Sequence, residues 1–162
     1  MSTLTMHDSV PDGLVVALYK GTQPGLWGIY NRLGRYLDGG KYSHAELCIG
    51  GLSYSSSLED GGVRVKTIGY SSVGSWDFVA IPDPKNVLAA GALKWFNEHM
   101  NQPYDILGNI HFALGFVKSS SDKWFCSESV AASLGFHEAY RYGPSGLAVA
   151  LQDKFGAQVV EI

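Results

Sequence analysis

The alternation of hydrophobic and polar positions predicts short strands in the first half of the chain. Residues 13–21 form an apolar run that ends at glycine, which is typical of a buried strand. Glycine pairs within 50–51 and 59–62 are turn residues that favour hairpins, so the strands around them should form an antiparallel sheet. The further strands are predicted over 43–49, 52–57, 63–68 and 76–81.

Helical spacing of apolar residues predicts helices before and after this group of strands. Residues 26–37 and 85–100 each carry an apolar stripe, and the second segment ends at "NQPYD". The stretch 119–135 has the features of a helix cap, a helix and a glycine stop. A last short helix follows "GPS", and "AQVVEI" is interpreted as a closing strand. This order predicts an α+β fold, and the absence of repeats or linkers predicts a single domain over 1–162.

Composition and charge narrow the class of protein. Hydrophobic residues make up 46% of the chain and charged residues 17%, as in a globular domain. The net charge of −3, without a block of like charges, argues against a nucleic-acid or anionic-membrane partner. The N-terminus lacks the features of a signal peptide, and the longest apolar run is far short of the ~20 residues that cross a bilayer. We therefore expect a protein made for the cytoplasm, without a transmembrane segment.

The candidate nucleophile is Cys126. Two cysteines do not make a disulfide framework, so at least one is free for other chemistry. Cys126, Val130 and Leu134 share one stripe of the predicted helix, and Cys126 lies in its first turn. The helix dipole and unpaired N–H groups there stabilise a thiolate and could hold the oxyanion formed when it attacks a carbonyl. Cys48 lies mid-strand, away from any helix end, and is interpreted as a core residue.

His44 and Glu46 are two residues apart on a predicted strand, and therefore share one face of the sheet. A helix packed on that face would present Cys126 to His44 as its general base, with Glu46 orienting the imidazole. A zinc site made of His44, Glu46 and Cys48 would need three ligands from one strand, which tetrahedral zinc rarely accepts. We therefore expect no metal and no cofactor.

Several segments of the chain together resemble those of one protein family. They are the opening strand, "YSHAELCIGG", "SYSSSLEDGGVRV", "QPYD" after a long helix, and "FCSESVAASLG" followed by "GPSGLAVAL", and they cover most of the chain. The chain thereby resembles the circularly permuted branch of the papain-like NlpC superfamily of cysteine peptidases and amidases, above all short proteins of bacteria and their phages. The resemblance implies an antiparallel sheet packed against helices, with the histidine strand before the cysteine helix. It also implies Cys126 as nucleophile and His44 as base.

The third residue of the constellation stays open between two strands. Many relatives carry the orienting polar residue on the strand after the histidine, which here offers Ser55, Ser57 or Glu59. Glu46 is preferred because a carboxylate orients and stabilises an imidazolium better than a hydroxyl does.

The expected function is that of a cofactor-free thiol hydrolase acting on amide or peptide bonds through Cys126, His44 and Glu46. By family resemblance, its substrates would be cell-wall peptides. Two alternatives stand beside it: a non-catalytic virion or interaction protein that keeps the fold, and a lipid acyltransferase or amidase. Stoichiometric reaction of Cys126 with an electrophilic probe, or its absence, distinguishes the hydrolase from the non-catalytic protein. Activity on fatty-acyl esters would favour the lipid acyltransferase or amidase.

Overall fold

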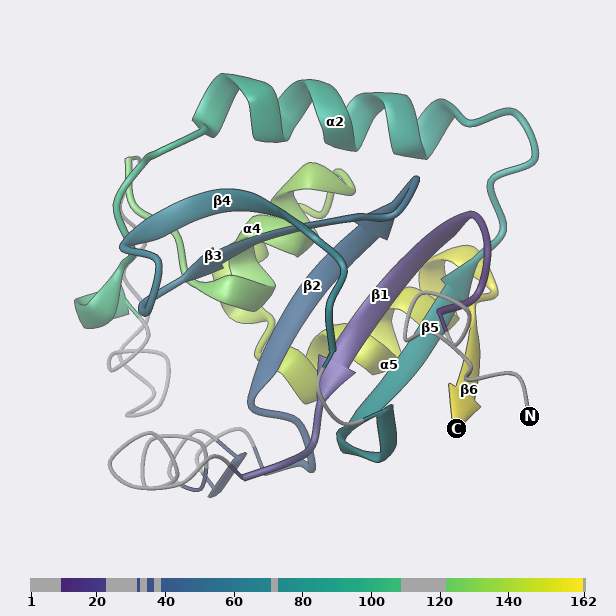
Figure 1. Cartoon of the computed structure of the whole chain (residues 1–162), viewed down its shortest axis with the longest axis horizontal. Coiled ribbons are helices and arrows are strands. Elements are labelled where there is room, and N and C mark those ends of the chain that lie inside the picture. Colours follow the sequence, from purple (N-terminus) through teal and green to yellow (C-terminus); the bar gives the residue numbers. More distant parts are fainter. Residues whose placement is uncertain are drawn as a thin grey trace.

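The computed structural model describes residues 10–22, 32, 35–36, 39–70, 73–108 and 122–161. This part of the chain has an α+β fold, in which one antiparallel sheet is packed against helices (Figure 1). The strands are β1 (Leu14–Tyr19), β2 (His44–Ile49), β3 (Leu52–Ser57), β4 (Gly62–Thr67), β5 (Trp76–Ile81) and β6 (Gln158–Glu161). The helices are α2 (Val87–His99), α4 (Cys126–Ser133) and α5 (Pro144–Phe155), with short 3-10 turns η2 (Val73–Ser75) and η3 (Ala139–Arg141).

The six strands lie in the order β4-β3-β2-β1-β5-β6, and neighbouring strands are antiparallel. Each predicted strand is confirmed to within two residues of its expected ends. Gly50 and Gly51 both have positive φ, as the two-residue turn between β2 and β3 requires. The antiparallel sheet predicted from the turn residues is therefore present.

The predicted helices are confirmed in the second half of the chain. The segment 85–100 forms α2, and the helix expected after "GPS" is α5, which begins at Pro144. Within 119–135, where a cap, a helix and a glycine stop were predicted, the helix α4 begins at Cys126, and 119–121 lie outside the described residues. Most of the predicted helix over 26–37 also lies outside them. In the described part of the chain, no helix is long and apolar enough to cross a membrane.

The two faces of the sheet carry separate hydrophobic clusters. The larger cluster joins one face, with Val16, Leu18 and Leu47, to the buried sides of α2, α4 and α5. The smaller cluster covers the opposite face and includes Val15 and Cys48. Because side chains alternate along a strand, His44 and Glu46 share the face of Cys48, away from the three helices. The sheet therefore has a helix-covered face and a face that carries the candidate polar residues.

The segment 101–105 connects the β4 edge of the sheet to the chain just before α4. The Val63 N–H donates to the Gln102 carbonyl at 2.9 Å, and the Tyr104 N–H donates to the Gly61 carbonyl at 3.2 Å. The Trp124 N–H then donates to the Pro103 carbonyl at 3.2 Å. This chain of backbone hydrogen bonds fixes the entry to α4 relative to the sheet. At Gly62 a Cβ would lie 2.0 Å from the Gln102 carbonyl oxygen, so the close approach requires glycine.

Candidate active site

The sheet opens between β2 and β3 at the start of β2. The two strands pair from Leu47 opposite Tyr54 to Ile49 opposite Leu52, and separate toward His44 (Figure 1). Serine side chains bond the separated backbones: Ser55 Oγ donates to the Ala45 carbonyl at 2.7 Å. The Ser56 N–H donates to Ser129 Oγ of α4 at 3.1 Å. The first turns of α4 thus take the place of a strand neighbour in the opening.

Cys126 is the first residue of α4 and points into this opening. The preceding residue, Phe125, has an extended backbone and is the last residue before the helix. Its N–H donates to the Glu128 side chain at 3.2 Å, which fixes the first turn of the helix. Only 4% of Cys126 is exposed, and the backbones of Ala45 and Ser127 hydrogen-bond its sulfur. The sequence correctly predicted a cysteine in the first turn of a helix.

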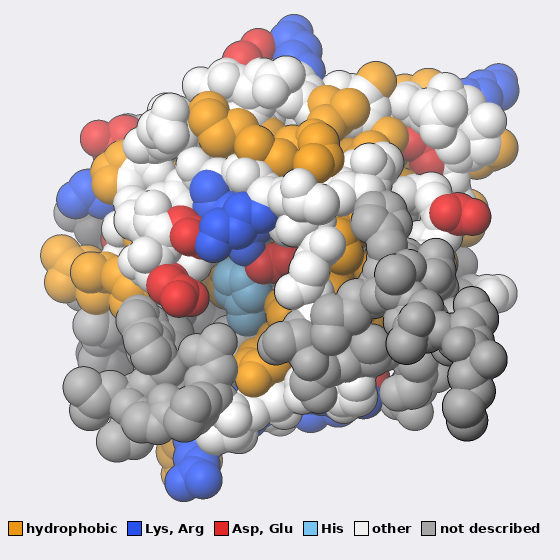
Figure 2. Space-filling model, in the orientation of Figure 1, with side chains coloured by type: hydrophobic (Ala, Val, Ile, Leu, Met, Phe, Trp, Pro, Cys, Tyr) orange, Lys and Arg blue, Asp and Glu red, His pale blue; other side chains and the backbone are white. Residues whose placement is uncertain are grey.

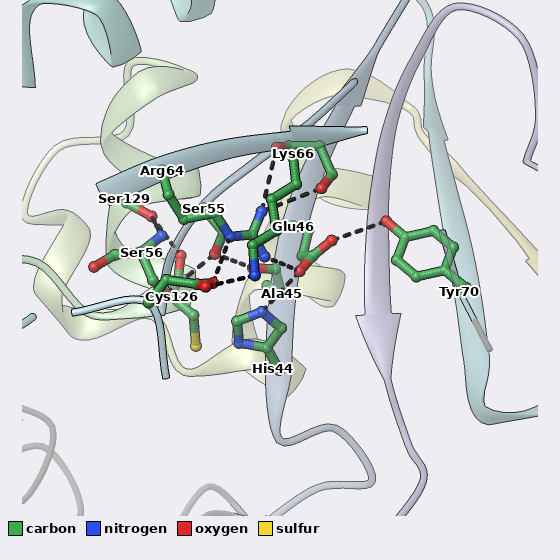
Figure 3. A network of polar contacts seen from close by, with 12 residues as sticks. His44, Ala45, Glu46, Ser55, Ser56, Arg64, Lys66, Tyr70, Cys126 and Ser129 are labelled. Carbon is green, nitrogen blue, oxygen red and sulfur yellow. Dashed lines mark hydrogen bonds and ion pairs between the residues drawn. The ribbon is translucent and has the colours of Figure 1, made fainter. Parts of the chain in front are cut away.

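The sequence predicted that the Cys126 helix and His44 would share one face of the sheet. In the structure they lie on opposite faces. Val130 lies in the larger hydrophobic cluster, which places the body of α4 on the helix-covered face. His44 belongs to the opposite face by strand alternation. The two side chains nevertheless meet, because Cys126 at the end of the helix reaches His44 through the opening between β2 and β3 (Figure 3). The expectation of a common face is therefore wrong, but the expected pairing is present.

The Cys126 thiol and the His44 imidazole are electrostatically coupled. Burial by itself lowers the pKa of His44, but the charge and hydrogen bond of Cys126, together with Glu46, outweigh it and raise that pKa to about 10. Burial raises the pKa of the Cys126 thiol, but the charge and hydrogen bond of His44, with backbone hydrogen bonds, bring it below its usual value. Each group stabilises the charged form of the other, so the site favours a thiolate beside an imidazolium.

Glu46 contacts the other side of the His44 ring. Its Oε1 lies 3.1 Å from His44 Nε2, so the side chain leans back along the strand toward the imidazole. In Figure 3 the ring lies between this carboxylate and the Cys126 sulfur. With Nε2 engaged by Glu46, Nδ1 is the ring nitrogen left for the sulfur. The structure therefore brings Cys126, His44 and Glu46 together in one row.

The other candidates for the third position lie elsewhere. Ser55 is fully buried and its hydroxyl serves the backbone of β2, as described above. Ser57 is half-buried at the end of β3, and Glu59 is exposed in the following turn. In this structure the contact with the imidazole is made by Glu46 and not by the next strand.

Two further residues of the site were missed by the sequence analysis. Arg64 on β4 contacts Glu46 Oε1, and the Tyr70 hydroxyl donates to Glu46 Oε2 at 3.0 Å. Burial raises the pKa of Glu46, but hydrogen bonds and charges from His44 and Arg64 outweigh it and lower that pKa to about 2. The available signal was the alternation along β4, which places Arg64 on the face of His44 and Glu46.

Cys48 has the environment of a core residue, in line with its interpretation. It is 2% exposed, and its sulfur lies 3.1 Å from the Tyr70 hydroxyl. Burial raises the pKa of the Cys48 thiol to about 12, in contrast to Cys126. Within the described ranges, no group of three His, Cys, Asp or Glu side chains could hold a metal ion.

The face that carries His44 is open to solvent at the imidazole. The His44 side chain is 23% exposed, whereas Glu46 beside it is buried. Figure 2 shows a histidine recessed on this face of the molecule, next to a cluster of basic and acidic side chains. A ligand can therefore reach the imidazole from this side, and the Cys126 sulfur lies beside the ring, away from Glu46 (Figure 3).

No family model matches the chain, and a search of curated proteins finds no match.

Proposed function

We propose that this protein is a thiol hydrolase that cleaves amide or peptide bonds without a cofactor. The observation that carries the proposal is the contact of the Cys126 thiol, at the first residue of α4, with the His44 imidazole. A thiolate paired with an imidazolium at a helix N-terminus is an activated nucleophile, because the base already holds the thiol proton. Glu46 supports this role, since it contacts the ring nitrogen that faces away from the sulfur.

The proposed reaction runs in two stages through an acyl-enzyme. The Cys126 thiolate attacks the carbonyl carbon, and the carbonyl electron pair moves onto oxygen, where first-turn N–H groups of α4 stabilise it. As the tetrahedral intermediate collapses, the C–N bond breaks and the leaving amine takes the proton from His44. Water then attacks the thioester, with His44 accepting its proton. Cleavage of the C–S bond releases the acid, and the proton on His44 restores the starting pair.

The substrate class is proposed from the family resemblance. The order along the chain, with the His44 strand before the Cys126 helix, supports a circularly permuted papain-like arrangement. That resemblance favours peptide or amide substrates derived from the cell wall. In this proposal Glu46 is the residue that orients His44. The main competing function is that of a non-catalytic virion or interaction protein.

The proposal is tested by labelling with a panel of electrophiles. Peptide, acyl and fatty-acyl probes are incubated with the native protein, and the modified residue is mapped by mass spectrometry. We expect stoichiometric modification of Cys126 by peptide-type probes, lost in Cys126→Ala and strongly slowed in His44→Ala. Preference for fatty-acyl probes would favour the lipid acyltransferase or amidase alternative. Absence of labelling by any probe would favour the non-catalytic protein.

A further inference from the structure

We propose that Arg64 is a positioning residue, which holds the Glu46 carboxylate charged and fixed against the His44 imidazole. The inference rests on the proposed function, because it assigns how the Cys126–His44 pair is supported. Of the hydrogen bonds and ion pairs drawn in Figure 3, none joins Arg64 to the sulfur or to the imidazole, so Arg64 would act through Glu46 alone.

Small side chains on β3 allow Arg64 to reach across a whole strand. Arg64 lies on β4 directly opposite Ser55, while Glu46 lies beyond β3 on β2. Ser53 and Ser55 are the β3 residues beneath its path, and both are buried serines. A larger residue at either position would occupy the space that the guanidinium crosses. The small side chains of Ser53 and Ser55 therefore leave this path open to the arginine.

The guanidinium is held along its length before it meets the carboxylate. Its Nε donates to Asp60 Oδ2 at 3.1 Å, and Nη1 donates to the Ser53 carbonyl and hydroxyl at 3.2 and 3.1 Å. Nη2 donates to Glu46 Oε1, the same oxygen that contacts His44 Nε2. The Arg64 side chain is only 13% exposed. Because the planar guanidinium is held by three hydrogen bonds, its fourth contact, to Glu46, has a fixed position. The flexible side chain of a lysine would not fix it in this way.

Glu46 needs such a partner because it is a buried carboxylate. It is 6% exposed, and an ionised carboxylate out of water is stable only when it is paired and hydrogen-bonded. Its surroundings are His44 and Cys48 on its own strand, Arg64 from β4, and Tyr70 on its second oxygen. Arg64 is the permanent cation of this set, since His44 is charged only when protonated. Glu46 can thus stay ionised even when His44 has given up its proton.

The test compares Arg64→Met with Lys66→Met. Lys66 lies two residues along β4 and pairs with the same Asp60, but it does not contact Glu46. The two variants therefore remove one positive charge each from the same strand and face. The rate of Cys126 alkylation by iodoacetamide is measured from pH 4 to pH 9, with mass-spectrometric mapping of the modified cysteine. Arg64→Lys is included as the conservative replacement.

The expected result is a shift of the acid side of the alkylation profile. Without Arg64, Glu46 should take up a proton at a pH higher by about 1–3 units, because an adjacent opposite charge lowers a carboxyl pKa by that amount. A neutral Glu46 stabilises the imidazolium less, so fewer thiolates form at acidic pH. Arg64→Met should therefore alkylate up to about tenfold more slowly than wild type near pH 4, the acid end of the profile, and Arg64→Lys should fall between them. Lys66→Met should follow the wild-type profile.

Three outcomes would overturn the inference. Coincident profiles for wild type and Arg64→Met would show that Arg64 has no influence on the Cys126–His44 pair. The proposed function would still stand in that case if wild-type Cys126 alkylates as a low-pKa thiol. An ordinary thiol profile in wild type would remove both proposals. If Arg64→Met does not fold, the double variant Glu46→Gln with Arg64→Met should fold, because it leaves no unpaired buried carboxylate. Failure of the double variant as well would assign Arg64 to the fold, independent of Glu46.

Discussion

Ser129→Ala tests how α4 closes the opening in the sheet. The Ser129 hydroxyl accepts the Ser56 N–H at 3.1 Å and donates to the Cys126 carbonyl at 2.8 Å. It therefore joins β3 to the first turn of the helix that carries the candidate nucleophile. Alanine removes this hydroxyl and leaves the helix propensity at the position favourable.

The magnitude follows from the burial of the group that is left behind. Ser56 is fully buried, and its N–H loses its partner in the variant. A buried donor without a partner costs about 1–3 kcal/mol of unfolding free energy. For a domain of this size that corresponds to a fall in Tm of roughly 3–10 °C. The natural control is Ser127→Ala, because the Ser127 hydroxyl is buried and has no hydrogen-bond partner among the residues that the structure describes. Removing it should leave stability within about 0.5 kcal/mol of wild type, or raise it.

The assay is equilibrium unfolding in urea at pH 7, followed by circular dichroism, for wild type and both variants. The midpoint of Ser129→Ala should fall while the slope m stays constant, which identifies a change in stability alone. Equal losses for the two serines, or an unchanged midpoint for Ser129→Ala, would refute the assignment of this hydroxyl as the bond across the opening.

Three more predictions concern the charged groups of the site. Glu46→Gln should fold but lose between a few-fold and ~10⁴-fold in kcat/KM on a peptide or amide substrate. Ser55→Ala should lower kcat/KM much less. Full turnover in Glu46→Gln would show that another residue orients His44. Cys126 should alkylate faster than Cys48 near neutral pH in a mass-spectrometric time course, since only Cys126 has a lowered thiol pKa, and equal rates would contradict this. The pKa of Glu46 is lowered to about 2 from 4.5, so its stabilising contribution is complete above pH 4.5 and is lost as pH falls toward 2. Wild-type unfolding free energy should therefore decrease more steeply than that of Glu46→Gln in acid unfolding measurements, and parallel curves would argue against an ionised, paired Glu46.

The strands and most helices could be predicted from the sequence because their signals are local. Glycine pairs such as Gly50-Gly51 mark turns, and alternating residues between them mark half-buried strands. The pairing of Cys126 with His44 was also predictable, from a cysteine at a helix start and a histidine on a strand. The strands and helices needed only neighbouring residues, whereas the pairing joined two distant segments through the chemistry of their side chains.

The opening in the sheet could not be predicted, and it explains the error about the common face. Strand alternation gives the face of His44, but it does not show that β2 and β3 separate, which depends on the contacts of α4 with both strands. Arg64 was missed for a similar reason. On an edge strand an arginine has the pattern of a solvated residue, and only the strand order shows that it crosses β3 to reach Glu46.

The position of Cys126 in the opening also bears on how the protein acquires its reactivity. The hairpins β2–β3 and β3–β4 join neighbouring segments and can form early, because closing a short loop costs little entropy. The Cys126–His44 contact is of high contact order, since it spans half of the chain and requires α4 to enter between strands that are already built. A chain whose sheet has formed but whose α4 has not docked would carry Cys126 as an ordinary thiol. In a refolding experiment, the appearance of rapid Cys126 alkylation should therefore follow the recovery of β-structure, and would mark completion of the native state.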